Sequence, residues 1–253
     1  MDLEVLKLIE EISGLTKNDE VLEIGAGLGT LTKFLAARTK RVVAVEKDKR
    51  LFEKLKAYVS QISNIELILD DALKIDFKRY IKRKKMKVVS NLPYSVSSPI
   101  IIRLLENKDL FSVLVLMIQR EVGERISAKP GGKVYGSISV LAQTFMEVSI
   151  ELFVPPEAFW PKPKVDSVVL KLVPLFKPTI KIPDEKLFKK IVRAAFSSRR
   201  KILANSLCSL FSKDIADELL KSAGIDRKRR AETLSIVEFV RLTEETLRIY
   251  GNR

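Results

Sequence analysis

Apolar residues form short runs separated by amphipathic stretches over the first half of the chain. The runs at 21–24, 41–45 and 65–69 are rich in Val, Ile and Leu, and the stretches between them carry apolar residues at helical spacing. A further run at 111–118 is nearly continuous, as expected for a strand buried on both faces. Because strands and helices alternate from about residue 20 to residue 119, the pattern predicts an α/β fold with a mostly parallel sheet.

The second half of the chain changes from alternating to helical. Two strands are expected at about 148–154 and 165–173, and they should pair as an antiparallel edge of the sheet. Three prolines within 174–183 then indicate a linker, and the pattern beyond it is helical only. We therefore expect two domains, residues 1–176 and a small all-α domain, residues 177–253.

Three glycines lie at the turn that follows the first predicted strand. Their order, Gly25-x-Gly27-x-Gly29, comes just after Glu23 and opens a helix. Glycines at such a turn let a ligand approach the backbone closely. The order differs from the Gly-x-Gly-x-x-Gly of dinucleotide binders. The glycines alone are also compatible with a tight turn that binds nothing.

Acidic residues follow the next two predicted strands. Glu46 with Lys47 ends the second, and Asp70-Asp71-Ala72 ends the third. A carboxylate at Glu46 suits a ribose diol, and an acid after the third strand could accept a hydrogen bond from an adenine amino group. Each acid could also be a solvated strand end, but their order and spacing favour a pocket for an adenosine without a pyrophosphate. S-adenosylmethionine fits that description better than NAD.

A fourth strand end carries Asn91-Leu92-Pro93-Tyr94. An amino group on a nucleobase is a poor nucleophile, because its lone pair is delocalised into the ring. The amide oxygen of Asn91 and the carbonyl of Leu92 could both accept hydrogen bonds from that group and make the lone pair available. Pro93 fixes the backbone, and Tyr94 offers a flat face on which a base can stack. Asn-x-Pro is also ordinary turn chemistry.

Composition and charge favour an anionic partner. The chain of 253 residues has a formal net charge of +14, and residues 177–253 carry 18 Lys and Arg against 10 Asp and Glu. This imbalance favours nucleic acid, although a basic thermophilic protein without such a partner has the same composition. The densest basic clusters there are Arg199-Arg200-Lys201 and Arg227-Lys228-Arg229-Arg230, which are alternatively solvated helix ends. A third basic run at 78–87 precedes the strand that ends in Asn91, so we expect it at the opposite end of the sheet from the site, as a secondary RNA contact or a solvated face.

Several classes of site are excluded by composition. The chain has one cysteine, Cys208, and no histidine, which excludes an internal disulfide, a cysteine-rich metal site and a histidine-based triad. We expect no metal. No signal-peptide pattern and no apolar run of 18 residues appears, so we expect a cytoplasmic protein without a membrane partner.

The chain resembles the small-subunit ribosomal RNA adenine N6,N6-dimethyltransferases over nearly its whole length. Besides the motifs above, the resemblance covers Gln119 to Val122 with Arg125, residues 135–140, the Pro-rich segment 154–167, and segments 195–201 and 230–235. It implies a Rossmann-like methyltransferase domain that uses S-adenosylmethionine, followed by a helical domain that binds RNA. It also implies transfer of two methyl groups to each of two adjacent adenosines near the 3′ end of small-subunit ribosomal RNA.

The resemblance and the motifs together identify the expected site residues. The catalytic residues are Asn91, Leu92, Pro93, Tyr94 and, from the resemblance, Phe159 as a second stacking aromatic, whose alternative role is a core aromatic. The cofactor-binding residues are Glu23, Gly25, Ala26, Gly27, Gly29, Glu46, Lys47, Asp71, Ala72 and Asn91. The RNA-binding residues are Arg199, Arg200, Lys201, Arg227, Lys228, Arg229 and Arg230.

One departure from the family pattern leaves other functions open. Family members carry an N-terminal segment before the first helix, whereas Met1 here falls almost directly on that helix, so cofactor affinity and full activity are in question. The alternatives are a large-subunit ribosomal RNA adenine methyltransferase of the antibiotic-resistance type, a non-catalytic small-subunit assembly factor, and a DNA adenine methyltransferase. The expected partner is small-subunit ribosomal RNA, within a partly assembled 30S-type subunit, and the expected state is a monomer.

Overall fold

The computed structural model describes residues 2–81, 84–177, 180–198 and 200–250. The chain divides into two compact units. Unit 1 comprises Met1–Gly123 with Glu147–Pro174, and unit 2 comprises Glu124–Met146 with Leu175–Arg253.

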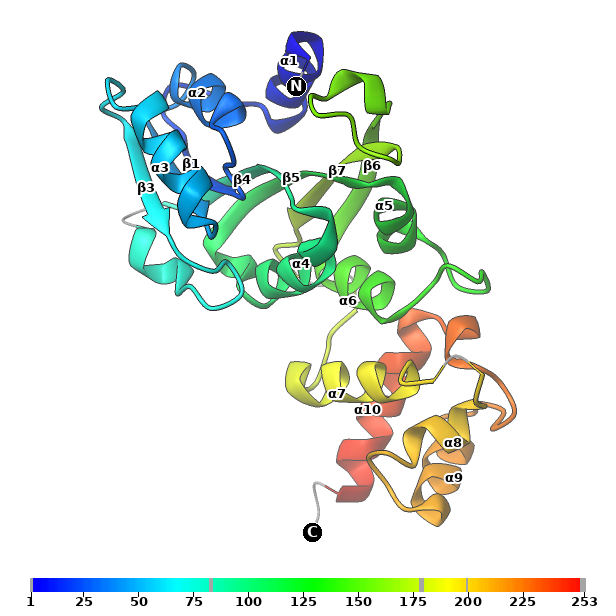
Figure 1. The fold of residues 1–253 in the computed structure, drawn as a ribbon. Helices are drawn as coiled ribbons and strands as arrows, with labels where there is room; N and C mark the ends of the chain where they lie inside the picture. The colour runs from blue at the N-terminus through cyan, green and yellow to red at the C-terminus, as the bar shows by residue number, and fades with distance from the viewer. Residues whose placement is uncertain (1, 82–83, 178–179, 199, 251–253) are drawn as a thin grey trace. The chain divides into compact units, whose positions relative to one another are not determined.

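Unit 1 is built on a seven-stranded sheet in the order β3-β2-β1-β4-β5-β7-β6 (Figure 1). Strands β1 to β5 pair in parallel, and β7 runs antiparallel to β5 with β6 outside it. The mostly parallel sheet and the edge position of the last two strands are therefore confirmed. The strands are β1 (Glu20–Ile24), β2 (Arg41–Glu46), β3 (Ile65–Leu69), β4 (Met86–Asn91), β5 (Phe111–Gln119), β6 (Met146–Val154) and β7 (Ser167–Pro174).

The strand order reverses between β1 and β4. From β1 the chain proceeds outward to β2 and β3, and then returns to place β4 and β5 on the other side of β1. In open α/β sheets, ligands bind beyond the carboxyl ends of the strands at such a reversal. The segments after β1 and β4, Gly25–Gly29 and Asn91–Tyr94, both leave the sheet at this place.

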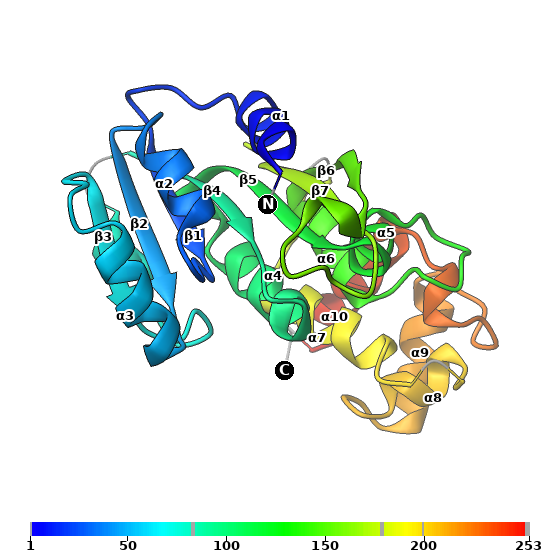
Figure 2. The same ribbon diagram turned by 45° about the horizontal axis from the view of Figure 1, so that its top comes forward.

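Helices cover both faces of the sheet in unit 1 (Figures 1 and 2). Helices α1 (Leu3–Ser13), α2 (Thr30–Ala36) and α3 (Lys49–Tyr58) pack on one face, where one buried apolar cluster joins all three to the sheet. Helix α4 (Ser97–Glu106) lies on the other face and buries Ile101 and Leu104 completely. Short 3-10 turns connect these elements: η1 (Phe77–Tyr80), η2 (Tyr94–Val96), η3 (Lys108–Leu110) and η4 (Pro156–Ala158).

Unit 2 is helical and is held by a core of aromatic residues. Phe196 stands between Tyr135 and Phe239, with ring centroids 6.0 and 5.9 Å away, and Phe145 meets Phe188 edge-on at 6.3 Å. Its helices are α6 (Ser137–Phe145), α7 (Glu185–Ala195), α8 (Leu203–Leu207), α9 (Lys213–Ser222) and α10 (Ile236–Tyr250), with the turn η5 (Ala231–Thr233). Helix α5 (Arg120–Ser127) begins in unit 1 and continues into unit 2. Within the described part of the chain, no helix is long and apolar enough to cross a membrane.

The two units differ from the expected division at residues 176 and 177 in one respect. The chain leaves unit 1 near Pro174, close to the expected boundary, but the segment 124–146 also belongs to unit 2. The physical reason is the burial of α6, which packs against α7 through Phe145 and Phe188. The loop before α6 is tied to the same unit by a hydrogen bond from Gly131 N to Glu232 O at 2.8 Å.

Candidate active site

A pocket of about 450 Å³ lies at the carboxyl ends of β1, β2 and β3. This volume suits a small-molecule ligand of nucleoside size. Four stretches of chain line it: the ends of β1 and β2, the turn after β3, and the segment between β4 and α4. The lining residues are Ile24, Gly25, Val45, Glu46, Lys47, Asp48, Asp70, Asp71, Ala72, Leu73, Pro93, Ser95, Val96 and Ile100.

The glycine turn packs directly against the Asn91–Tyr94 segment. Gly25 has φ +74°, and a Cβ built on it would lie 2.9 Å from Pro93 Cδ. A side chain at this position would therefore be strained and would also push Pro93 away. Gly27 and Gly29 likewise have positive φ, 59° and 90°, and a Cβ on Gly29 would lie 2.6 Å from Leu55 Cδ1. These contacts explain why the turn is made of glycine and why the two motifs form one site.

Glu46 is held rigidly at the edge of the pocket. Its Oε2 accepts a hydrogen bond from Gly27 N at 2.8 Å, and its Oε1 accepts from Lys47 N and Asp48 N, both at 2.8 Å. The side chain is buried. Three amides thus fix a carboxylate at the edge of the pocket. Its Oε1 already accepts two hydrogen bonds, and its Oε2 keeps a lone pair for a further donor. A ribose diol is a donor of that kind.

Asp71 closes the pocket on the side of β3. Its Oδ2 accepts a hydrogen bond from Lys47 Nζ at 2.8 Å, and its Oδ1 accepts from Leu73 N at 3.0 Å. The hydrogen bond from Lys47 and the one from Leu73 lower the pKa of Asp71 below its ordinary value. Asp71 is therefore an ionised acceptor next to the buried Ala72.

Glu23 lies beneath the pocket and does not line it. The residue is 1% exposed, and burial raises the pKa of its carboxyl to about 8. The Thr32 hydroxyl opposes this rise, and the charge of Glu46 adds to it. Among the described residues, neither Glu23 Oε2 nor Thr32 Oγ1 completes a hydrogen bond of standard geometry. At pH 7 the carboxyl of Glu23 is thus mainly in its neutral, protonated form.

Asn91 presents an acceptor that has no donor. Its Oδ1 is buried and lacks a hydrogen-bond partner in the described chain. Such an atom carries a free-energy cost unless a ligand satisfies it. The next residue, Leu92, is buried and donates its N–H to Met117 O at 3.0 Å, so β5 positions it. No backbone N–H of the described residues bonds to the Leu92 carbonyl, which is a second acceptor beside Asn91.

The two expected stacking aromatics are held in different ways. The Tyr94 hydroxyl lies 2.5 Å from Ser167 Oγ, at the buried start of β7, so the ring is anchored at its far end. Phe159 is partly buried and packs against the apolar cluster beneath α1, α2 and α3. Its ring therefore contributes to the core, which was the alternative considered for it, and part of it remains accessible.

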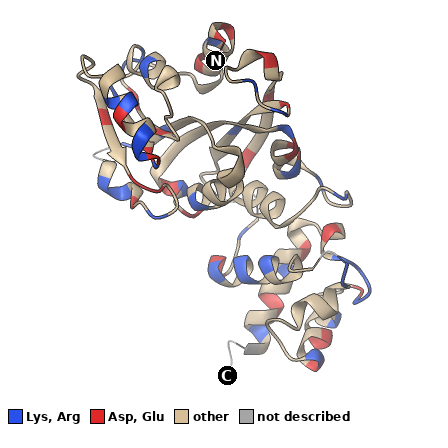
Figure 3. Cartoon of the chain, viewed as in Figure 1, with Lys and Arg blue, Asp and Glu red and all other residues tan. Residues whose placement is uncertain are grey.

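Figure 3 marks Lys and Arg in one colour, but the basic residues expected to bind RNA differ in their contacts. Arg229 is engaged within unit 2: its guanidinium pairs with Glu238 and donates to Thr233 O at 2.7 Å. Arg227 lies 3.2 Å from Asp217 Oδ2 in an exposed pair. Arg199 lies outside the described residues. The exposed members of the two clusters that have no ion pair in the described chain are Arg200, Lys201, Lys228 and Arg230.

Several residues of the site were not expected from the sequence. Leu73, Ser95, Val96 and Ile100 line the pocket, and Ser167 anchors Tyr94 from a strand 73 residues away. Leu73 and Ser95 directly follow expected site residues, so extending each motif by one position would have found them. Ser167 had no such signal. In the described part of the chain, no group of three or more acidic, Cys or His side chains could hold a metal ion.

Comparisons with known proteins agree with this geometry. A family model described as ribosomal RNA adenine dimethylase matches residues 1–247. The ribosomal RNA small subunit methyltransferase A of Clostridium botulinum (strain Kyoto / Type A2) is 47% identical over 246 residues, which cover 96% of this chain and 90% of that protein.

Solved structures show the same fold. A dimethyladenosine transferase from Plasmodium falciparum superposes with a TM-score of 0.80 at 27% identity and covers 99% of this chain and 97% of its own. The 23S rRNA methyltransferase ErmE has a TM-score of 0.70 at 24% identity, covering 97% of this chain and 98% of its own, and shows the fold alone. The chain belongs to the ribosomal RNA adenine dimethylase family.

Proposed function

We propose that this protein transfers methyl groups from S-adenosylmethionine to N6 of two adjacent adenosines near the 3′ end of small-subunit ribosomal RNA. The observation that carries this proposal is the buried, unpartnered Asn91 Oδ1 on the segment that packs against the glycine turn of a nucleoside-sized pocket. Membership of the family and the names of the curated relatives support the substrate.

The residues of the pocket fit the cofactor. S-adenosylmethionine supplies a methyl group on a positively charged sulfur, so the carbon can be attacked by a weak nucleophile. Glu46, fixed by three amides, would accept from the ribose hydroxyls, and Asp71 would accept from the adenine amino group. The backbone of Gly25–Gly29 would allow close approach. Lys47 holds Asp71 in place. Glu23 does not line the pocket, and burial favours its neutral form, which adds no negative charge beside Glu46.

Asn91 and Leu92 would make the target nitrogen reactive. Both the Asn91 amide oxygen and the Leu92 carbonyl can accept hydrogen bonds from the N6 amino group, which draws the nitrogen toward a tetrahedral geometry. Because β4 and β5 hold this segment, the acceptors are positioned before the substrate arrives. No strong base is needed, since the methylated ammonium loses its proton readily to water.

The target adenosine must leave its stack before it can reach the site. Extruding a base costs a few kcal/mol, and stacking on an aromatic ring returns about 1–3 kcal/mol per contact. Tyr94 and the accessible part of Phe159 would supply these contacts. In this proposal residues 1–176 form the catalytic domain and residues 177–253 the RNA-binding domain, where Arg200, Lys201, Lys228 and Arg230 are the best candidates for phosphate contacts.

The alternatives have less support. A large-subunit methyltransferase shares the fold, but the likeness to ErmE is below the identity at which function can be transferred. A non-catalytic assembly factor would not need an unsatisfied acceptor at Asn91. A DNA adenine methyltransferase has no support among the relatives reported above. We further propose a partly assembled 30S-type subunit as substrate, a monomeric state and a cytoplasmic location.

The test is methyl transfer from tritiated S-adenosylmethionine to small subunits that lack adenine dimethylation, followed by mapping of the label. Label on two neighbouring adenines near the 3′ end supports the proposal. Label only on large-subunit RNA or on duplex DNA would identify one of the alternatives. Cofactor binding without any label would indicate an assembly role, and absence of cofactor binding by calorimetry would contradict the assignment of the pocket.

Replacing Asn91 tests the proposed chemistry. Asn91→Ala removes one positioned acceptor, so we expect the rate of transfer to fall by about 100-fold or more. The affinity for S-adenosylmethionine, measured by calorimetry, should stay within about threefold, since Asn91 Oδ1 is assigned to the target base. Asn18→Ala, at an exposed asparagine after α1, is the matched control and should retain full activity. An Asn91→Ala rate within about tenfold of the wild type would refute this role, because tenfold corresponds to only about 1.4 kcal/mol.

A further inference from the structure

Trp160 is the only tryptophan in the chain, and 91% of its surface is exposed. Tryptophan is among the most apolar surfaces that a side chain can present, and it is highly buried on average. Because Trp is enriched at interfaces, an indole left in water on a folded surface is a candidate contact residue. It lies in the loop 155–166, between β6 and β7 in Figures 1 and 2.

The loop holds Trp160 outward on a fixed base. Its neighbours Ala158 and Phe159 pack against the core, and Asp2 N donates to Ala158 O at 2.8 Å. At the other end, Arg120 N donates to Asp166 O at 3.0 Å. Four prolines within the loop restrict its backbone further. The exposure of the indole therefore follows from the anchored loop, and little conformational entropy is lost when a ligand binds to it.

Basic residues follow Trp160 along the loop. Lys162 and Lys164 follow it closely, both are exposed, and Lys164 makes no ion pair within the described chain. Lys162 is paired with Glu157 across the loop. Arg120 lies over the Phe153 ring at 5.3 Å, beside a hollow of about 210 Å³. An aromatic face with lysines on the same loop is the arrangement that binds unpaired nucleotides, because the ring stacks on a base and the cations meet the phosphates.

The residue that follows the loop contacts the proposed catalytic segment. This residue is Ser167, whose Oγ lies 2.5 Å from the Tyr94 hydroxyl. A nucleotide bound at Trp160 would thus be held by the element that anchors the stacking platform of the target base. This continuity favours RNA over a protein partner as the ligand of Trp160.

We infer that Trp160 is a second stacking site, which binds an unpaired RNA base other than the adenosine that reacts. This inference rests on the proposed function and extends it: Tyr94 holds the target base, while Trp160 with Lys164 holds a neighbouring unpaired nucleotide. The ligand class is single-stranded or loop RNA, and no particular base is required, because every base has a face that can stack.

Intrinsic fluorescence tests this directly, since all tryptophan emission comes from one residue. The protein is titrated with an RNA hairpin that carries unpaired adenines, and separately with a fully paired duplex of the same length and charge. Stacking on a base should quench the emission with the hairpin, and the duplex should quench it far less. Equal quenching by both RNAs would overturn the inference.

Substitutions distinguish base stacking at Trp160 from a general effect of an exposed aromatic residue. Trp160→Ala should weaken binding of the hairpin by about 5- to 100-fold, whereas Trp160→Phe, which keeps an aromatic face, should stay within about threefold of the wild type. Phe176→Ala removes an aromatic ring that is 98% exposed, in unit 2, and is the matched control; its affinity should be unchanged. Because Trp160 is exposed, its replacement should leave the melting temperature unchanged.

The outcomes distinguish this inference from the proposed function. If small subunits are methylated on adjacent adenines while Trp160→Ala binds the hairpin normally, the function stands and the stacking site is refuted. If the hairpin quenches emission and Trp160→Ala weakens binding but no methyl transfer occurs, the stacking site stands alone. Emission that responds to assembled subunits and not to naked RNA would overturn base stacking and indicate a protein contact instead.

Discussion

Two buried oxygen atoms beside the glycine turn, Asn91 Oδ1 and Glu23 Oε2, lack a hydrogen-bond partner in the described chain. The amide oxygen of Asn91 cannot change its protonation state to avoid the free-energy cost of burial without a partner. It therefore needs a hydrogen-bond donor, which the proposed substrate supplies. The carboxyl of Glu23 can remove its cost by taking up a proton, and burial raises its pKa to about 8. A missing hydrogen-bond partner therefore indicates ligand binding at Asn91 and a change of protonation at Glu23.

Glu23 should make stability depend on pH above the acid range. Its pKa is about 8 in the folded protein against an ordinary value of 4.5, so the folded chain binds more protons between these values. Stability from this group is then fully present below pH 4.5 and is lost as the pH rises toward 8. Glu23→Gln cannot ionise, and we expect it to remove a slope of roughly 1 kcal/mol per pH unit across this window.

Urea unfolding of the wild type and Glu23→Gln at several pH values between 5 and 8 measures this slope. The pKa values of Asp19 and Glu238 are lowered, so those carboxyls titrate below the chosen range and do not interfere. Glu11→Gln, at an exposed carboxyl on α1, is the control and should follow the wild type. Parallel curves for wild type and Glu23→Gln would show that Glu23 stays ionised in the folded state.

Site residues that directly follow a strand could be predicted from the sequence. Gly25, Glu46 and Asp71 each end an apolar run, and parallel strands place their carboxyl ends at one edge, so all three line one pocket. Whether they hold the cofactor stays a prediction. The anchor of Tyr94 could not be found this way, because it depends on Ser167 in a strand that pairs with β5 from the opposite direction.

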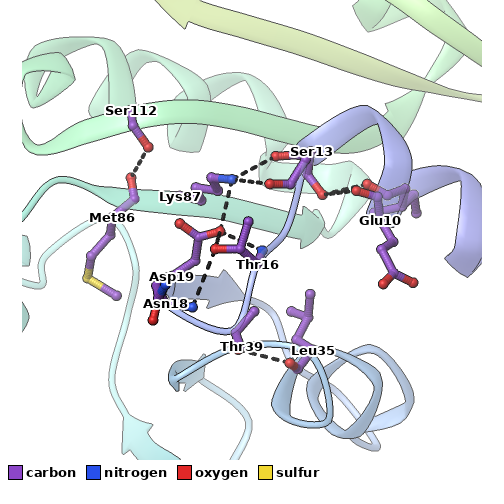
Figure 4. Close-up of polar contacts among 12 residues, drawn as sticks. Glu10, Ser13, Thr16, Asn18, Asp19, Leu35, Thr39, Met86, Lys87 and Ser112 are labelled. Carbon is purple, nitrogen blue, oxygen red and sulfur yellow. Dashed lines mark hydrogen bonds and ion pairs between the residues drawn. The ribbon is translucent and has the colours of Figure 1, made fainter.

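At the scale of elements, the carbonyls at the C-terminal end of helix α1 accept hydrogen bonds from a residue of a distant strand (Figure 4). The helix ends at Ser13, is capped by Gly14 and has no basic residue in its last turn. Lys87, from β4, donates to Ser13 O at 3.1 Å and to Gly14 O at 2.5 Å, and it pairs with Asp19 Oδ2 at 3.0 Å. The last carbonyls of a helix carry partial negative charge, so this cation stabilises α1 and joins it to the sheet.

Replacing Lys87 should therefore destabilise unit 1. Lys87→Met removes charge-assisted hydrogen bonds from a mostly buried site and leaves Asp19 without its partner, so we expect a loss of about 2 kcal/mol in the free energy of unfolding. Lys85→Met, at an exposed lysine of the same basic run, should change it by less than about 0.5 kcal/mol. Urea unfolding compares the two variants. Equal effects would show that the contacts of Lys87 contribute nothing beyond surface charge.

Helices and strands could be predicted from the sequence wherever the pattern that specifies them is local. The five parallel strands were expected close to their observed positions, because each has its own periodicity. Two results depend on tertiary packing and could not be predicted from the sequence. One is the inclusion of α6 in unit 2, and the other is the role of Lys87 within a run expected to contact RNA or solvent. Lys82 and Arg83 of that run lie outside the described residues.

At the scale of the whole molecule, the count of 46 Lys and Arg residues overstates the number of cations available to RNA. Arg41 pairs with Glu20 and Glu66, and Lys87 pairs with Asp19. Arg229 pairs with Glu238, which in turn accepts from Ser235 N at 2.8 Å at the start of α10. The number of basic residues is therefore a weak guide, and the unpaired, exposed cations determine where a phosphate backbone can bind.

The basic cluster before α10 allows this partition to be tested within four residues. Lys228 and Arg230 are exposed and unpaired in the described chain, whereas Arg229 holds Glu238. Replacing Lys228 and Arg230 together by Ala should lower the slope of log affinity for small-subunit RNA against log salt by about 0.7–0.9 per lost phosphate contact and leave stability unchanged.

Arg229→Ala should do the reverse, costing about 1–3 kcal/mol of stability with the slope unchanged, because it releases the capping carboxylate of α10. RNA binding between low and moderate salt, with urea unfolding beside it, measures both quantities. A reduced salt slope in Arg229→Ala would show that the Glu238 pair opens to bind phosphate.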